Sequence, residues 1–127
     1  MKKQDLPLSP HLQIYKPQIT SLLSISHRIS GVALNFVLVI LVLGLLCITL
    51  GESYFELLIS LINSFPIKII IFLAILGFSY HFLNGIRHII WDFGFLLGNR
   101  SSAIFGYIII ATSFISSILI SRLLGVF

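Results

Sequence analysis

Three long apolar stretches dominate the sequence, at about residues 29–50, 67–90 and 104–124. A helix needs about 20 predominantly apolar residues to cross the hydrocarbon layer of a membrane. Lipid offers no partner for an unpaired backbone group, so a spanning segment must satisfy its own hydrogen bonds, as a helix does. The pattern therefore predicts an all-α membrane protein with three transmembrane helices, in a single membrane-anchor domain over residues 1–127.

The segment between the first two stretches, GESYFELLISLINSFP, is less apolar. Gly51 and Pro66 mark its ends, and weakly polar positions alternate with apolar ones between them. This pattern predicts a short interfacial helix rather than a fourth span. The composition agrees with a membrane protein, because 57% of the residues are hydrophobic, only 9% are charged and the mean hydropathy is +1.10. A soluble domain of this size is far more polar.

The basic residues predict the orientation of the spans. Two of them, Lys68 and Arg122, fall on one side of the membrane, and the other six fall on the N-terminal side: Lys2, Lys3, Lys16, Arg28, Arg87 and Arg100. Basic residues concentrate on the cytoplasmic side, so residues 1–28 are predicted to be a cytoplasmic segment. The net charge of +4 is thus explained by topology, and we expect no nucleic-acid partner.

Polar residues form two stripes at the cytoplasmic ends of the first two spans. With about 100° of rotation per residue, each set falls on one helix face. The second span carries His81, Gly85, His88 and Asp92, and the first carries Ser24, Arg28, Gly31 and Asn35, with His27 at its edge. Ionisable residues in lipid are costly and face a bundle interior or an aqueous path, while glycines permit close approach. The two stripes predict a pocket near the cytoplasmic surface.

His81 lies seven residues deeper than His88, about 10 Å at 1.5 Å per residue. One interpretation is a hydrogen bond from His81 to a serine or a backbone carbonyl of a neighbouring helix. The other is an axial bond to haem iron, because imidazole suits iron and a haem needs an apolar slot with cationic groups near its propionates. On the second interpretation, the slot and the propionate partners come from Gly77, Gly85, His27, Arg28 and His88.

Ser24 and Arg28 also have two interpretations. They are either ordinary helix-start residues, with the arginine reaching lipid phosphate, or the binding groups of a quinone headgroup. A quinone ring has two carbonyl oxygens, which a hydroxyl and a cation at the edge of the hydrocarbon would hold. Asp92 is interpreted as a salt-bridge partner of Arg87 or His88.

The third span contains a line of small residues and no predicted chemistry. Ser113, Ser117 and Ser121 follow one another at intervals of four residues, and Gly106 precedes them by one heptad. Small residues at helical spacing let two helices approach closely, so this line predicts a packing seam.

Two strings together resemble a known family. SISHRISG (residues 24–31) and HFLNGIRHIIWDFG (residues 81–94) are similar to the two signature motifs of the cytochrome b membrane-anchor subunits of succinate dehydrogenase. LSPHLQIYKPQITS resembles the mitochondrial and alphaproteobacterial branch of that family. Family members commonly have Arg-Pro where this chain has Leu6-Pro7. The resemblance covers essentially the whole chain.

The resemblance implies a role for each motif residue. Ser24 and Arg28 would line the ubiquinone site, and His27 with Arg28 would approach the haem propionates. His81 would be one axial ligand of haem b, with the second ligand from another anchor subunit, because no further histidine is expected at comparable depth. Three other residues would serve the propionate side (Arg87 and His88) and the interface with hydrophilic subunits (Asp92).

The function so implied is that of a membrane-anchor subunit of succinate:ubiquinone oxidoreductase, complex II of electron transport and an enzyme of the tricarboxylic acid cycle. Succinate would be oxidised at FAD, and electrons would pass through iron–sulfur clusters to ubiquinone. This chain has one cysteine, Cys47, and no Gly-rich dinucleotide loop, so a flavoprotein and an iron–sulfur subunit are required. A second hydrophobic anchor and the bacterial cytoplasmic or mitochondrial inner membrane complete the expected surroundings, and the chain alone is not expected to catalyse.

Two alternatives belong to other classes, and a third belongs to the same family. A proton-coupled transporter needs an acidic residue at mid-membrane depth, but Asp5, Glu52, Glu56 and Asp92 lie at or outside the predicted interfaces. A cofactor-free structural anchor would leave His81 without a purpose. The anchor of a related fumarate reductase is not distinguished by these residues, which encode neither the direction of the reaction nor the type of quinone.

Overall fold

The computed structural model describes residues 16–127, which form four helices. They are α1 (Ile19–Thr49), α2 (Glu52–Asn63), α3 (Phe65–Asp92) and α4 (Asn99–Leu123), and no strand occurs among the described residues. Helices α1, α3 and α4 are long and apolar enough to cross a membrane. The predicted all-α fold with three spanning helices is therefore confirmed. Lys2, Lys3, Asp5 and the Leu6-Pro7 pair lie outside the described residues.

Each spanning helix is longer than its apolar stretch. Helix α1 begins at Ile19, well before the apolar run at about residue 29, so the SISHRISG motif is helical throughout. Helix α4 likewise begins at Asn99. The predicted bounds count only the apolar residues that cross the hydrocarbon layer. A helix extends beyond them until a turn-forming residue ends it.

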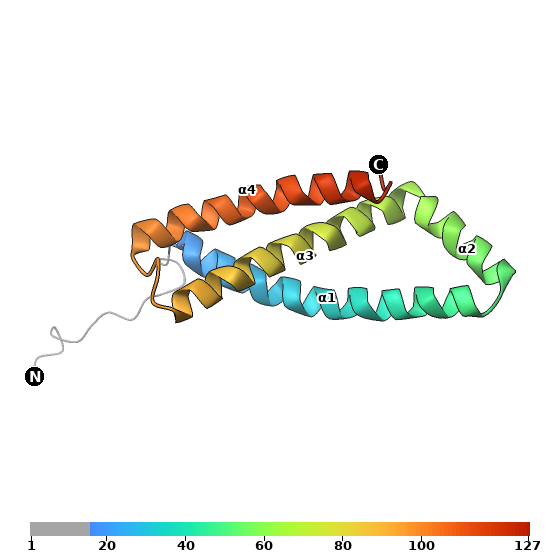
Figure 1. Ribbon diagram of the computed structural model, residues 1–127, viewed down its shortest axis with the longest axis horizontal. Coiled ribbons are helices and arrows are strands. Elements are labelled where there is room, and N and C mark those ends of the chain that lie inside the picture. Colours follow the sequence, from blue (N-terminus) through green and yellow to red (C-terminus); the bar gives the residue numbers. More distant parts are fainter. Residues whose placement is uncertain (1–15) are drawn as a thin grey trace, which may run out of the picture.

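Helix α2 forms where the sequence predicts a short helix, and it connects α1 to α3 at the end of the bundle away from the N-terminus (Figure 1). Gly51 precedes it with a φ of 114°, a conformation that other residues rarely adopt. From this end α1 and α3 converge toward the opposite end of the bundle (Figure 1). We call it the histidine end, because His27 lies near the start of α1 and His81 and His88 lie near the end of α3.

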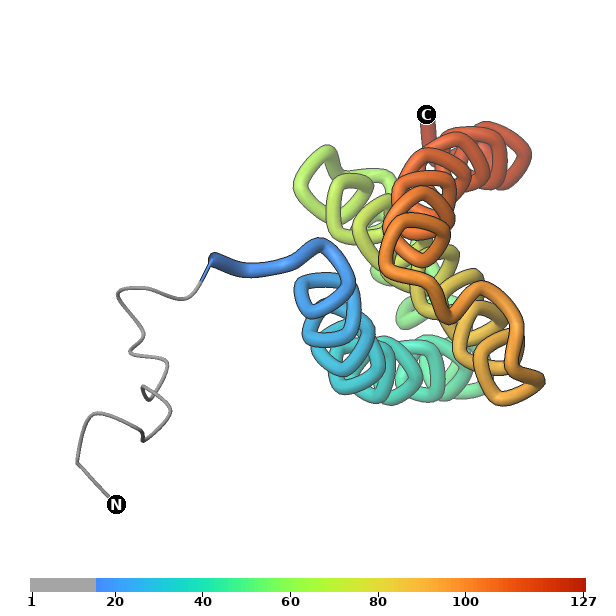
Figure 2. Tube along the Cα trace, turned by 90° about the vertical axis from the view of Figure 1, so that its left-hand side faces the viewer, coloured from blue at the N-terminus to red at the C-terminus, as the bar shows by residue number. Residues whose placement is uncertain are grey.

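Helix α3 runs between α1 and α4 and contacts both (Figure 2). Its interface with α4 is the small-residue seam that the third span predicts. Gly106, Ser113, Ser117 and Ser121 are all buried, and the same face of α4 also buries Ser102. The predicted packing seam is therefore confirmed. At Gly106 it meets α1, because a Cβ added there would clash with Leu23, and elsewhere α4 packs mainly on α3.

Helix α3 ends in a Schellman motif. Gly94 has a φ of 81°, and its N–H donates to the Trp91 carbonyl at 2.8 Å, while the Phe95 N–H donates to the Ile90 carbonyl at 3.2 Å. These two bonds satisfy carbonyls that a helix end would otherwise leave open. The motif fixes the last turn of α3, where His88 and Trp91 are found.

Candidate functional site

Three imidazoles from two helices meet at the histidine end. The rings of His27 in α1 and His81 in α3 are stacked, with centroids 4.1 Å apart and an angle of 10° between their planes. The His88 ring lies 5.1 Å from His27 at an angle of 43°. We call these three residues the histidine cluster. Of the two predicted stripes, His27 and Gly31 of the first meet His81, Gly85 and His88 of the second at this cluster.

The stacking corrects one expectation from the sequence. We expected no further histidine at the depth of His81, but a stacked ring must lie at nearly the same depth. The estimate failed because the first span was taken to begin at residue 29, which left His27 outside the membrane. Helix α1 begins earlier and crosses α3, and it brings His27 beside His81.

The hydrogen bonds of His81 hold its ring in one orientation. Its Nδ1 lies 3.1 Å from the His27 carbonyl and 3.1 Å from the Ser30 hydroxyl. A proton on Nδ1 is donated to this carbonyl, and Nε2 then carries a free lone pair. Metal-binding histidines are usually oriented in this way, through a hydrogen bond from the other ring nitrogen to a carbonyl. The hydrogen-bonding and the ligand interpretations of His81 are therefore compatible.

Two glycines make room for the stacked rings. A Cβ atom added at Gly31 would lie 3.0 Å from Cε1 of His81, and one added at Gly85 would lie 3.8 Å from Nε2 of His27. Gly77, by contrast, has open space around its Cα. Close packing at the cluster therefore depends on Gly31, and the haem slot at Gly77 and Gly85 stays a prediction.

Arg87 is turned away from the histidine cluster. Its side chain is 0% exposed, and Nη2 donates to the Ser102 hydroxyl at 2.9 Å and to the Ser102 carbonyl at 3.2 Å. Nη1 donates to Oδ1 of Asn84 at 3.3 Å. Arg87 lies about 100° round α3 from His88, which is the side that α4 covers. The expectation of an arginine near the headgroups beside the haem propionates does not fit this conformation.

The remaining predicted residues are open to their surroundings. Asp92 is exposed and forms no ion pair with another described residue, so the predicted salt bridge to Arg87 or His88 is absent from this part of the chain. Arg28 is exposed and Ser24 is half-buried. By helical rotation Ser24 and Arg28 lie about 60° and 100° round α1 from His27, so they do not join the ring stack.

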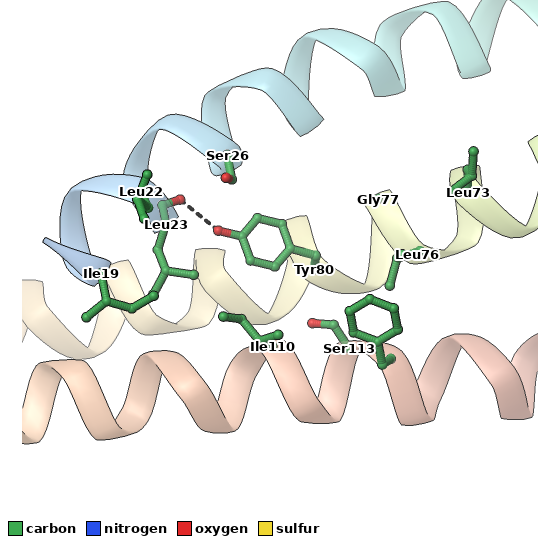
Figure 3. A pocket seen from close by; sticks show the side chains of 11 residues that line it. Ile19, Leu22, Leu23, Ser26, Leu73, Leu76, Gly77, Tyr80, Ile110 and Ser113 are labelled. Atoms are coloured by element: carbon green, nitrogen blue, oxygen red, sulfur yellow. Dashed lines mark hydrogen bonds between the residues drawn. The ribbon is translucent and has the colours of Figure 1, made fainter. Parts of the chain in front are cut away.

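A cavity of about 530 Å³ lies beside the cluster, between α1, α3 and α4 (Figure 3). Its walls are mostly apolar, and two of its three polar side chains, those of Tyr80 and Ser113, bond backbone carbonyls, while the third is Ser26. The Tyr80 hydroxyl donates to the Leu23 carbonyl at 2.7 Å, and the Ser113 hydroxyl donates to the Ile109 carbonyl at 2.6 Å. Such walls suit a hydrocarbon chain better than a polar headgroup. The sequence did not predict a role for Tyr80, and its only signal there is a hydroxyl group within an apolar span.

The donor set at the cluster fits one kind of metal centre. Within residues 16–127 no group of three or more His, Cys, Asp or Glu side chains is arranged to hold a metal ion. A haem brings its own equatorial nitrogens, and from the protein it needs axial imidazole and partners for its propionates. His81 offers an oriented imidazole, and the buried Nε2 of His27 has no hydrogen-bond partner among the described residues. These residues fit a haem.

Comparison with known proteins identifies the family of the chain. The succinate dehydrogenase/fumarate reductase transmembrane subunit family matches residues 2–120. The chain is 42% identical over 114 residues to the succinate dehydrogenase cytochrome b556 subunit of Rickettsia typhi, covering 90% of this chain and 89% of that protein. It is 45% identical over 101 residues to the cytochrome b560 subunit of Marchantia polymorpha, covering 75% and 73%.

The similarity extends to a red alga, since the cytochrome b560 subunit of Chondrus crispus is 44% identical over 104 residues, covering 76% of this chain and 78% of that protein. Bacterial and eukaryotic relatives thus match over most of their lengths, as the two motifs predict. The chain belongs to the succinate dehydrogenase/fumarate reductase transmembrane subunit family.

Proposed function

We propose that this chain is the membrane-anchor subunit of a succinate:ubiquinone oxidoreductase that binds haem b through His81 and forms part of the ubiquinone site through Ser24 and Arg28. The observation that carries the proposal is the histidine end itself. There an oriented imidazole, an exposed cation and a buried Nε2 of His27 with no hydrogen-bond partner in residues 16–127 lie on neighbouring faces of two apolar helices.

His81 would hold the haem through Nε2, while its Nδ1 keeps the bond to the His27 carbonyl. Haem b supplies one-electron chemistry when bound. Nε2 of His27 would gain an acceptor from a propionate, and Arg28 and His88 would serve as further propionate partners. The second axial ligand is assigned to a second hydrophobic anchor subunit, because the stacked rings of His27 and His81 present their faces, not their nitrogens, to each other.

Ser24 and Arg28 would bind the ubiquinone headgroup. Both side chains donate hydrogen bonds, and the two carbonyl oxygens of a quinone accept them. Those oxygens gain negative charge as electrons arrive, which a fixed guanidinium stabilises. Because Arg28 is exposed on the outside of α1, it is available to a site completed by the iron–sulfur subunit. The apolar tail of the quinone would remain in lipid.

The partners follow from what the chain lacks. Its single cysteine, Cys47, cannot hold an iron–sulfur cluster, so the clusters and the FAD belong to an iron–sulfur subunit and a flavoprotein. Asp92, exposed at the histidine end, is available to those hydrophilic subunits. The membrane would be a bacterial cytoplasmic or a mitochondrial inner membrane.

The quinone assignment is tested on the purified complex with two electron acceptors. Succinate-dependent reduction of a short-chain ubiquinone needs the membrane site, whereas reduction of a soluble dye by the iron–sulfur subunit does not. We expect Arg28→Leu to lower ubiquinone reduction at least tenfold, about 1.4 kcal/mol, while dye reduction is unchanged. Arg100→Leu removes an exposed arginine of α4 and serves as the matched control. Equal ubiquinone reduction by both variants would contradict the assignment.

A further inference from the structure

Arg87 is a buried cation whose described neighbours include no carboxylate. It is 0% exposed, and its contacts are Asn84, Ser102 and the ring of Trp91. An arginine in such a place carries a large desolvation cost, which neutral acceptors offset only when they are well placed. A shorter polar residue would join two helices at a smaller desolvation cost. The buried guanidinium therefore needs an explanation other than helix packing.

The guanidinium of Arg87 lies over the face of the Trp91 ring in a cation–π contact. The Cζ atom of Arg87 lies 4.1 Å from the centre of the Trp91 ring. The indole N–H of Trp91 is buried and has no acceptor among the described residues, so the ring is placed by stacking rather than by a hydrogen bond. The ring also meets His88 edge to face, with centroids 5.2 Å apart and an angle of 87°.

The contacts continue from Trp91 through the histidine cluster. His88 packs against His27, which is stacked on His81. A series of side-chain contacts therefore runs from Ser102 in α4 to His81, and Arg87 is the residue that joins α4 to the rings. We propose that Arg87 is a positioning residue that fixes Trp91 and, through it, the orientation of the imidazoles. This inference rests on the proposed function insofar as those imidazoles serve a haem.

The geometry requires an arginine rather than any cation. One nitrogen of the fork bonds both oxygens of Ser102, another bonds Asn84, and the flat group lies over the Trp91 ring. A lysine ammonium keeps the charge but has neither the fork nor the flat face. Arg87→Lys therefore separates the two explanations. If Arg87→Lys keeps the wild-type properties of the haem, the charge of Arg87 acts on an anionic group. If Arg87→Lys loses them, Arg87 acts by positioning Trp91.

A double-mutant cycle on the purified complex tests the route through Trp91, with the haem midpoint potential and the b-type absorption band as readouts. We expect Arg87→Gln and Trp91→Ala each to shift both, and the double variant to shift them no further than the larger single change, because both remove one series of contacts. We expect Arg87→Lys to resemble Arg87→Gln, and the exposed-residue control Arg100→Gln to match wild type. Additive shifts, or full restoration by lysine, would overturn the proposal.

A second readout does not depend on haem. Carbethoxylation of His88 in the same complexes, followed by peptide mass spectrometry, reports how well Trp91 covers that imidazole. We expect Arg87→Gln and the milder Ser102→Ala, which removes the 2.9 Å bond, to increase the labelling rate several-fold while Arg100→Gln leaves it unchanged. Unchanged labelling in Arg87→Gln would overturn the proposal. Absence of a b-type band in wild type would instead contradict the haem assignment, and the labelling would still decide the role of Arg87.

Discussion

The two sides of α3 are built differently. Toward α4 it meets a seam of small residues in which Ser113 and Ser117 are almost completely buried and bond carbonyls of their own helix. Toward α1 it carries the histidine cluster, with a buried nitrogen of His27 that has no partner among the described residues. Both sides bury polar atoms that have no partner among the described residues, such as the Ser121 hydroxyl toward α4 and Nε2 of His27 toward α1. The two sides differ in their chemistry, because the α4 side offers hydroxyls that pack two helices together, whereas the α1 side offers imidazole nitrogens, which suit a metal centre.

The largest effect is expected from breaking the seam. Ser117 is 0% exposed, so Ser117→Leu forces a branched side chain between α3 and α4. Overpacking of a filled interior costs about 1–3 kcal/mol, and here it also pushes apart the helices that hold Arg87. We expect a lower thermal stability of the complex and a reduced yield. Ala111→Leu adds the same bulk to the exposed face of α4, and an equal loss in both variants would contradict the seam.

A selective loss is expected from a change on the α1 side. A Cβ at Gly31 already lies 3.0 Å from the His81 ring, so Gly31→Leu displaces that imidazole while the seam stays intact. We expect loss of the b-type band in a complex that still assembles and still reduces a soluble dye. The control is Gly44→Leu, because the space around Gly44 is open. A normal band in Gly31→Leu would indicate that His81 does not need its present position.

The smallest effect is expected at the cavity. Tyr80→Phe removes the 2.7 Å hydrogen bond to the Leu23 carbonyl, which joins α3 to α1. The net loss for one such bond is about 1 kcal/mol, so the thermal midpoint of the complex should fall slightly and the b-type band should remain. Tyr107→Phe, at an exposed position of α4, should change neither quantity. A lost band in Tyr80→Phe would place Tyr80 in the cofactor site.

The sequence predicts the parts of this molecule that depend on one helix at a time. Apolar length gives the three spans, and a four-residue interval gives the seam of Ser113, Ser117 and Ser121. The sides that two helices present to each other depend on their crossing and rotation, which local pattern does not encode. For this reason the stacking of His27 on His81, the turn of Arg87 toward Ser102, and the contact of Tyr80 with α1 appear only in the structure.

The central claim is that His81 is an axial ligand of haem b. It is tested most directly by dithionite-reduced minus oxidised absorption spectra of the purified complex, for wild type, His81→Leu and the control variant Arg100→Leu. We predict a b-type band in wild type that is lost or shifted in His81→Leu and unchanged in Arg100→Leu, which alters an exposed residue of α4. A wild-type complex without the band, or an unchanged band in His81→Leu, would contradict the claim.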